Sequence, residues 1–213
     1  MNSLVRFYIK SKKSDISFFI IIIKHIYYRI LGKNIFASNS TKIRGVKNIT
    51  TISKLQIGIE EVAFMLSSDK TFLNIEGELV VQGNAYIGKG CRMTIGGSTK
   101  LVLNRVFINA NCLFVISNGL EIGDNTVISW NCQFIDDDFH KINYKGKVES
   151  SKKINIGNHV WIGANSVILK GVYIADGCVI AANSIVTKSV TEQNVLIAGN
   201  PAKIIKREIQ WEI

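Results

Sequence analysis

The stretch IDDDFH at residues 135–140 holds three consecutive acids and one of only three histidines in the chain, His140. Imidazole has an ordinary pKa of about 6.5, so it can take a proton from a hydroxyl near neutral pH and return it to a leaving group. Asp138 is placed to orient such a ring or to hold its tautomer; the alternative is a solvated loop acid. Asp136 and Asp137 are expected only to solvate the loop. These residues make His140 a candidate for proton transfer, against the plainer interpretation of a surface loop histidine.

The elements that must position His140 follow from a six-residue repeat. The anchors at this spacing are Ile116, Ile122, Ile128 and Phe134, and then Ile156, Ile162, Ile168, Ile174, Ile180 and Val186. A period of six matches neither an α-helix nor a half-buried strand. It suits a coil of triangular cross-section, in which three hexapeptides make one turn and each side is a short strand. The repeat predicts an all-β fold, a left-handed parallel β-helix.

His140 lies where this repeat stops. No anchor occurs between Phe134 and Ile156, a gap much longer than the period allows. A loop with about 16 extra residues must therefore leave the coil, and long ordered loops on rigid scaffolds often carry function. The expected organisation is a helical appendage, the β-helix with its protruding loop, and a tail, at residues 1–45, 46–200 (loop 135–153) and 201–213.

Three motifs resemble the hexapeptide-repeat acetyltransferases. They are IGNHVWIGANSVILKGV (156–172), AANSIVTKSV (181–190) and AGNPAKIIK (198–206), and the resemblance covers roughly residues 80–207. Galactoside and maltose, xenobiotic, and capsular polysaccharide O-acetyltransferases are most similar. The resemblance implies a homotrimer with active sites between neighbouring β-helices. It also implies direct acetyl transfer from acetyl-CoA to a sugar hydroxyl of a bacterial surface glycan (capsule, O-antigen or exopolysaccharide) or its precursor, with His140 as general base.

Other site residues follow from the same resemblance. Trp161 matches a tryptophan that lines the thioester site opposite the histidine, and an indole on a coil surface should face a ligand or a subunit. Asn109 matches an asparagine of the galactoside enzymes whose amide could hydrogen-bond sugar hydroxyls or the developing oxyanion; the alternative is a corner asparagine. Asp138 could also contact the acceptor sugar.

The donor side combines small and basic residues. The small residues, along which the family lays the pantetheine arm of acetyl-CoA, are Gly163, Ala164, Ala181 and Ala182. The residues matched to positions near the nucleotide, where ammonium groups would pair with phosphates, are Thr187, Lys188, Lys203 and Lys206. The alternative for these lysines is a solvated basic tail.

Most of the net charge of +10 belongs to the amino-terminal segment. Residues 1–50 hold ten of the 26 Lys and Arg residues but only one acid, Asp15. This uneven distribution argues against a nucleic-acid-binding domain. The four cysteines show no CxxC pairing and are expected to be reduced core residues of a cytoplasmic protein.

The same segment contains the apolar run ISFFIIII (16–23). This run is too short for a membrane-spanning helix, which needs about 20 residues, and no small-residue cleavage site follows. Two interpretations remain. The run packs as a helix against its own domain or a sister subunit, or residues 1–33 lie on the anionic inner face of the plasma membrane, close to lipid-linked glycan.

Two alternative functions stay open. One is N-acetylation of an amino sugar or nucleotide sugar, which would use the same base. The other is a non-catalytic trimeric scaffold, although a scaffold does not need the loop, His140 or Trp161. No metal is expected, because the spacing of the three histidines does not fit the metal-binding members of this fold.

Overall fold

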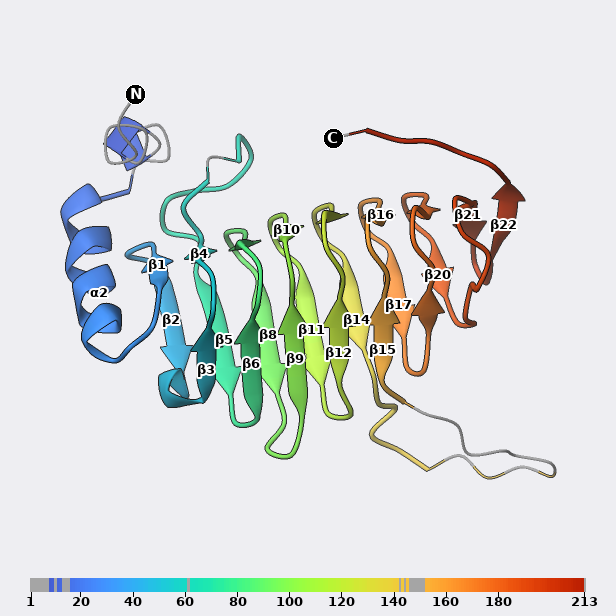
Figure 1. The fold of residues 1–213 in the computed structure, drawn as a ribbon, viewed down its shortest axis with the longest axis horizontal. Helices are drawn as coiled ribbons and strands as arrows, with labels where there is room; N and C mark the ends of the chain where they lie inside the picture. The colour runs from blue at the N-terminus through green and yellow to red at the C-terminus, as the bar shows by residue number, and fades with distance from the viewer. Residues whose placement is uncertain are drawn as a thin grey trace.

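A computed structural model describes residues 8–9, 11–12, 16–60, 62–141, 143, 145 and 152–212. The chain winds into a left-handed parallel β-helix, a prism whose three faces are parallel sheets (Figure 1). One helix, α2 (Phe18–Ile30), lies across its amino-terminal end. The fold class predicted from the six-residue repeat is therefore confirmed.

Each face of the prism is one sheet, named A, B or C, and the strands below are those of the described residues. Sheet A contains β1 (Ile35–Ala37), β4 (Leu55–Ile57), β7 (Ala85–Ile87), β10 (Val106–Ile108), β13 (Thr126–Ile128), β16 (Trp161–Ile162), β19 (Val179–Ile180), β21 (Leu196–Gly199) and β22 (Ala202–Lys206). Sheet B contains β2 (Thr41–Arg44), β5 (Thr71–Ile75), β8 (Arg92–Ile95), β11 (Leu113–Ile116), β14 (Gln133–Ile135), β17 (Val167–Leu169) and β20 (Ile185–Val186). Sheet C contains β3 (Ile49–Thr51), β6 (Glu78–Val81), β9 (Lys100–Leu103), β12 (Leu120–Ile122), β15 (Ile154–Ile156) and β18 (Tyr173–Ile174).

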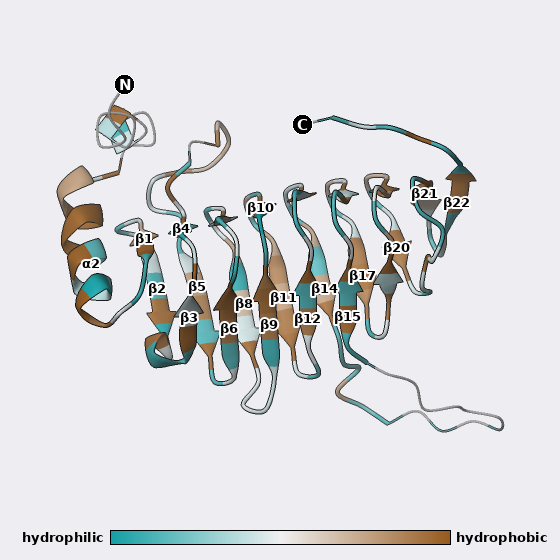
Figure 2. Cartoon of the chain, viewed as in Figure 1, coloured by the Kyte–Doolittle hydropathy of each residue, from teal (hydrophilic) through white to brown (hydrophobic). Residues whose placement is uncertain are grey.

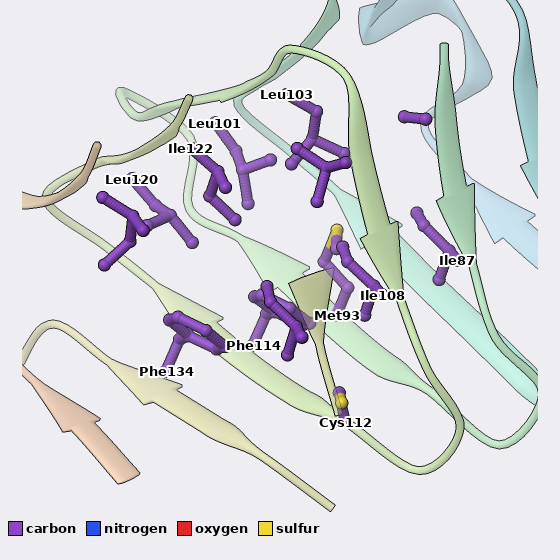
Figure 3. Close-up of a cluster of buried hydrophobic side chains, with 14 of the residues drawn as sticks. Ile87, Met93, Leu101, Leu103, Ile108, Cys112, Phe114, Leu120, Ile122 and Phe134 are labelled. Atoms are coloured by element: carbon purple, nitrogen blue, oxygen red, sulfur yellow. The ribbon is translucent and has the colours of Figure 1, made fainter. Parts of the chain in front are cut away.

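The anchors of the repeat fill the prism axis in stacked columns. Phe114 and Phe134 stack with ring centroids 4.7 Å apart and planes 3° from parallel. Figure 3 shows how side chains from successive coils converge on this axis, including Ile87, Met93, Leu101, Leu103, Ile108, Leu120 and Ile122. All four cysteines are buried and free of disulfides. Burial of these apolar columns is the main stabilising contribution to the coil.

Coil length differs between the two ends of the prism. At the carboxyl end Val167 pairs with Ile185, which lies three hexapeptides later in the sequence. Upstream, Ala85 pairs with Val106, a wider spacing than three hexapeptides. The additional residues lie in wider corners such as Gly96–Thr99, between β8 and β9. These corners explain why the repeat is regular only in the second half of the sequence.

The corner between sheets A and B, the A–B corner, is built on asparagines. Asn111, Asn131, Asn165 and Asn183 each have a φ of 60–61°. Asparagine tolerates this left-handed backbone better than other residues with a side chain. The backbone N–H of Asn165 donates to the Trp130 carbonyl one coil earlier, at 3.1 Å, and that of Asn183 donates to the Ala164 carbonyl at 2.9 Å. The corner residues of successive coils therefore form a regular column along the prism.

Helix α2 closes the amino-terminal end of the core. Ile21 and Tyr28 are buried, and the helix packs on β1. The Lys24 ammonium donates to the carbonyls of Ser38, at 2.7 Å, and Thr41, at 3.0 Å, and burial lowers the pKa of this amine. None of the helices in the described part of the chain is long and apolar enough to cross a membrane.

The coils begin at Ile35, inside the range 1–45 expected for the appendage. Two loops interrupt them, and Figure 1 shows the two loops at opposite edges of the prism. The loop that carries His140 runs between β14 and β15, as expected. A second loop, residues 58–70 between β4 and β5, was not anticipated. At the carboxyl end β22 turns back antiparallel to β21 within sheet A.

Candidate active site

His140 lies at the corner between sheets B and C, where its loop leaves the prism. The side chain is exposed and lines an open pocket of about 450 Å³. The other lining residues are Asp137, Asp138, Lys141, Asn143, Lys152 and Lys170. Loop residues 142, 144 and 146–151 lie outside the described residues. A solvent-accessible imidazole among fixed charges can accept a proton from a bound hydroxyl.

Asp136 corrects one expectation, because it does not solvate the loop. Its carboxylate is fully buried and accepts three backbone N–H groups, from Ser117, Asn118 and Gly119, each at 2.7 Å. These N–H groups belong to the turn between β11 and β12, one coil earlier. The carboxylate therefore fixes the point at which the His140 loop departs.

Asp137 also has a structural role. Its carboxylate pairs with Lys152 at 2.8 Å and accepts hydrogen bonds from Asn118 and from the backbone N–H of Phe139. The Lys152 ammonium is the main cause of the lowered pKa of this carboxyl group, followed by the Asn118 amide and the Phe139 N–H. Because Lys152 lies just before β15, this ion pair joins the outgoing and returning ends of the loop.

Asp138 pairs with Lys170, which follows β17. No hydrogen bond between described residues links Asp138 to His140. The carboxylate therefore pairs with an ammonium group of the next coil. No contact between described residues supports its expected role in orienting the imidazole. The Asp138 side chain lines the same pocket as His140.

Trp161 lies on a different face, in β16 of sheet A. Its indole is 41% exposed, and its Nε1 donates to Ser129 Oγ at 3.1 Å. The edge between sheets B and C, where His140 lies, is opposite sheet A in a triangular prism. A single chain therefore does not bring His140 and Trp161 together.

The carboxyl-terminal tail packs beside Trp161. Trp211 stacks on His159 with ring centroids 4.1 Å apart, and its Nε1 donates to the His159 carbonyl at 3.0 Å. The Trp161 and Trp211 rings lie 6.0 Å apart. His159 is thus held by the tail, and His25 stacks on Phe36 against the first coil. Both histidines therefore have structural roles in the described chain.

Asn109 occupies the first position of the A–B corner, after β10. Its Oδ1 accepts the backbone N–H of Ala110 at 2.8 Å. The Nδ2 group has no hydrogen-bond partner among the described residues, so it can donate to a ligand. Ser129 is the equivalent corner residue one coil later and binds the Trp161 indole. Asn109 and Trp161 therefore lie close together along one edge of the prism.

The small residues of the expected donor site lie on the same A–B corner. Gly163 is explained by packing, because a Cβ there would lie 2.6 Å from the backbone nitrogen of Ala182. Ala164 and Ala182 occupy the second corner position in successive coils, and Ala181 precedes Ala182. The close approach of coils thus accounts for the glycine, whereas the alanines keep the outer corner narrow.

The four expected nucleotide-side residues lie at the carboxyl end of the prism. Thr187 and Lys188 follow β20, and Lys203 and Lys206 belong to β22. All four are exposed, and none of the ion pairs between described residues involves the three lysines. Their positive charge is available for an anion.

Sequence reasoning missed several residues of these surfaces. Lys170 and Trp211 sit in regular or terminal segments and reach the site only through coil stacking and tail folding. The absence of anchors between Ile57 and Thr71 is a signal that could have located the 58–70 loop. Among the described residues, no group of three or more His, Cys, Asp or Glu side chains could hold a metal ion.

Comparisons with known proteins agree with the β-helix fold. Residues 153–188 match the family model of the bacterial transferase hexapeptide, six repeats. A 24.8 kDa protein of the cps region of Klebsiella pneumoniae is 37% identical over 206 residues, covering 95% of this chain and 93% of that protein. The galactoside O-acetyltransferase of Escherichia coli is 35% identical over 126 residues, covering 58% of this chain and 61% of that enzyme.

Among the solved structures that resemble this chain is one with a bound acetyl donor. It is the hexapeptide-repeat acetyltransferase VCA0836 of Vibrio cholerae, complexed with acetyl coenzyme A. The identity is 27%, the TM-score is 0.51, and the match covers 61% of this chain and 70% of that one.

Proposed function

Because the chain belongs to the hexapeptide-repeat acetyltransferases, we propose that it transfers acetyl from acetyl-CoA to a sugar hydroxyl of a bacterial surface glycan or glycan precursor. The observation that carries this proposal is His140, exposed in a charged pocket on a loop that Asp136 and Asp137 fix to the coil. The β-helix supplies rigidity and the loop supplies the reactive group, which together preorganise a base.

The proposed reaction passes through one tetrahedral intermediate. The sugar hydroxyl attacks the thioester carbonyl while its proton passes to the ring nitrogen of His140. The tetrahedral intermediate then collapses, the C–S bond breaks, and the imidazolium returns the proton to the CoA thiolate. The products are an O-acetyl ester and free CoA. All four cysteines are buried in the coil, which supports direct transfer without a cysteine acyl-enzyme.

The active site is proposed to form between two subunits of a homotrimer, with His140 from one chain and Trp161 from the next. This arrangement would unite two residues that one chain holds on opposite sides of the prism. The Trp161 indole and the Asn109 amide would then face the acetyl group and the acceptor.

Mixed trimers test the shared site. His140→Ala and Trp161→Ala chains are each expected to be nearly inactive alone. Co-assembled in equal amounts, they should regain about a quarter of wild-type turnover, because random assembly pairs an intact His140 with an intact neighbouring Trp161 at that frequency. The measurement is thiol release from acetyl-CoA, with co-assembly confirmed by tagged pull-down. No recovery in verified mixed trimers contradicts a site shared between subunits.

Acetyl-CoA is proposed to lie along the A–B corner, with its phosphates at the carboxyl end. The Lys188 and Lys203 ammonium groups are exposed and carry no ion pair within the described chain, so they fit phosphate oxygens. The alanines of the corner leave room for the pantetheine arm.

Exchanging both lysines for alanine should raise the KM for acetyl-CoA about tenfold with kcat little changed, because phosphate contacts bind ground state and transition state alike. Steady-state kinetics at saturating acceptor measure this. A Lys145→Ala variant, which removes a charge from the His140 loop instead, is the control for altered net charge. An unchanged KM in the double variant rules out this donor site.

The acceptor class is tested by thiol release with a panel of neutral and acidic oligosaccharides. Acetylation of hydroxyl-only sugars supports O-transfer, and turnover confined to free amino sugars favours the N-acetyltransferase alternative. A scaffold would release no thiol with any of them.

Helix α2 is proposed to attach the enzyme peripherally to an anionic membrane surface. One face packs on β1, but the other leaves large apolar side chains in solvent: Phe19 is 77% and Ile30 is 80% exposed, and Ile23 lies between them. Figure 2 shows that most of α2 is coloured as hydrophobic. Exposed bases of the amino-terminal part of the chain, including Arg29 on α2 and Lys47 in the first coil, would attract anionic lipid headgroups.

Vesicle flotation tests this attachment. Wild-type protein should float with phosphatidylglycerol vesicles at low salt and be released by high salt. An Ile23→Asp, Ile30→Asp variant should remain at the bottom of the gradient. Point changes are preferable to deleting residues 1–33, because deletion would uncover β1. Ile52→Asp, at an exposed site outside α2, is the control. Equal flotation of wild-type and α2 variant proteins would contradict the proposal.

A further inference from the structure

The 58–70 loop folds over the A–B corner and brings an aromatic ring to it. Its start is held by the Glu60 N–H, which donates to the Tyr86 hydroxyl at 2.9 Å. Further along, the Asn111 amide donates to Met65 Sδ at 3.4 Å. The loop thus runs along the corner column from the coil of β4 towards the coil of β13, and these hydrogen bonds hold it to the coils.

At the end of this path Phe64 meets Trp130. The two rings are 5.8 Å apart with planes at 69°, an edge-to-face arrangement. Both remain accessible, since Phe64 is 56% and Trp130 is 43% exposed. Two large aromatic side chains that contact each other yet stay open to solvent are costly unless a ligand covers them.

The position of this pair relates it to the proposed chemistry. Trp130 follows Ser129, whose hydroxyl receives the Trp161 indole N–H. It occupies the second corner position, which Ala164 and Ala182 occupy in the next two coils. The narrow column of small residues therefore ends at Trp130. Beyond it, one coil earlier, the corner offers the free amide donor of Asn109.

We infer that Phe64 and Trp130 form the platform on which the acceptor sugar ring stacks, an inference that rests on the proposed function. A pyranose has an apolar face of C–H groups, which packs on an aromatic face, and an equatorial rim of hydroxyls, which amide donors recognise. The platform supplies the first contact, and Asn109 supplies the second. Stacking would place a hydroxyl near Trp161, where the acetyl group is delivered.

The adenine of CoA is the competing occupant of an aromatic platform. The exposed lysines that fit its phosphates, Lys188 and Lys203, lie at the carboxyl end of the prism, beyond Ala164 and Ala182. The nucleotide would therefore lie at the far end of the corner column from Trp130. Position along the prism favours the sugar.

Saturation-transfer NMR and kinetics on the full-length protein test the platform. The probes are methyl β-galactopyranoside, methyl β-glucopyranoside and a sialic acid dimer. Wild-type protein should saturate the C–H protons of at least one probe. Phe64→Ala and Trp130→Ala should reduce that signal and raise the acceptor KM about tenfold, with the KM for acetyl-CoA unchanged. Trp130→Phe should restore both. Tyr173→Ala, an aromatic on sheet C, should behave as wild type, and melting temperatures check folding.

Three results would overturn the platform. They are the absence of saturation of any probe by wild-type protein, equal signals in wild type and both alanine variants, and an effect on the KM for acetyl-CoA instead of the acceptor. Thiol release in the same samples separates this inference from the proposed function. If probe binding requires both rings but no acetyl transfer occurs, the platform inference stands and the proposed function is contradicted.

Discussion

Replacing His140 by alanine should lower kcat by about 10²–10⁴-fold while leaving the fold and assembly intact. The loss is expected because the acids of the pocket are already paired with Lys152 and Lys170. Among the described groups of the pocket, this leaves the His140 imidazole to take the hydroxyl proton. The exposed side chain contributes little packing, so the melting temperature should not change.

The measurement is initial-rate thiol release from acetyl-CoA at saturating acceptor, together with size-exclusion chromatography. Lys145→Ala, at an exposed position of the same loop, is the matched control and should retain activity. A His140→Ala enzyme with near-normal kcat would remove His140 from the mechanism. A variant that is inactive because it no longer assembles would assign the histidine a structural role instead.

Replacing Asp136 by alanine should produce the largest loss of stability in the site. The carboxylate is fully buried and accepts three N–H groups at 2.7 Å, so its removal leaves three donors unpaired under the coil surface. We expect about 3–4 kcal/mol of destabilisation, which for a chain of this size lowers the melting temperature by about 6–15 °C. The His140 loop should lose its fixed point of departure, so activity should fall as well.

Thermal melting followed by circular dichroism measures the effect. Asp136→Asn keeps the shape but replaces one acceptor oxygen with an amide that faces N–H donors, so it should also be destabilised. Asp138→Ala removes a neighbouring acid whose ion pair is exposed and should change the melting temperature little. If Asp136→Ala has the same melting temperature as Asp138→Ala and wild type, the Asp136 carboxylate does not anchor the loop.

The sequence was most informative where the spacing of apolar anchors directly reflects the coil geometry. The period of six from Ile156 to Val186 predicts the coil because each anchor must point to the axis once per side. The long gap after Phe134 locates the His140 loop for the same reason. Upstream coils are longer than three hexapeptides and lack this strict period, so the 58–70 loop and its Phe64 were not predicted.

Contacts between coils could not be read from the sequence in the same way. In the sequence Asp136 is one of three similar acids, and only the stacking of its coil on the turn at Ser117–Gly119 shows that it is buried. Likewise the packing of Trp211 on His159 depends on the path of the tail. The placement of His140 and Trp161 on opposite sides of one chain follows from the triangular section once the residues are assigned to corners and faces.

The most direct test of the central claim follows an isotopically labelled acetyl group from acetyl-CoA to a glycan by mass spectrometry. The proposed mechanism predicts that wild-type enzyme attaches the label to the oligosaccharide through a bond that mild alkali cleaves, as an ester requires. It also predicts that His140→Ala abolishes this product and that no label is retained on the protein. Alkali-stable label would indicate N-acetylation, and label trapped on the enzyme would contradict direct transfer with His140 as the base.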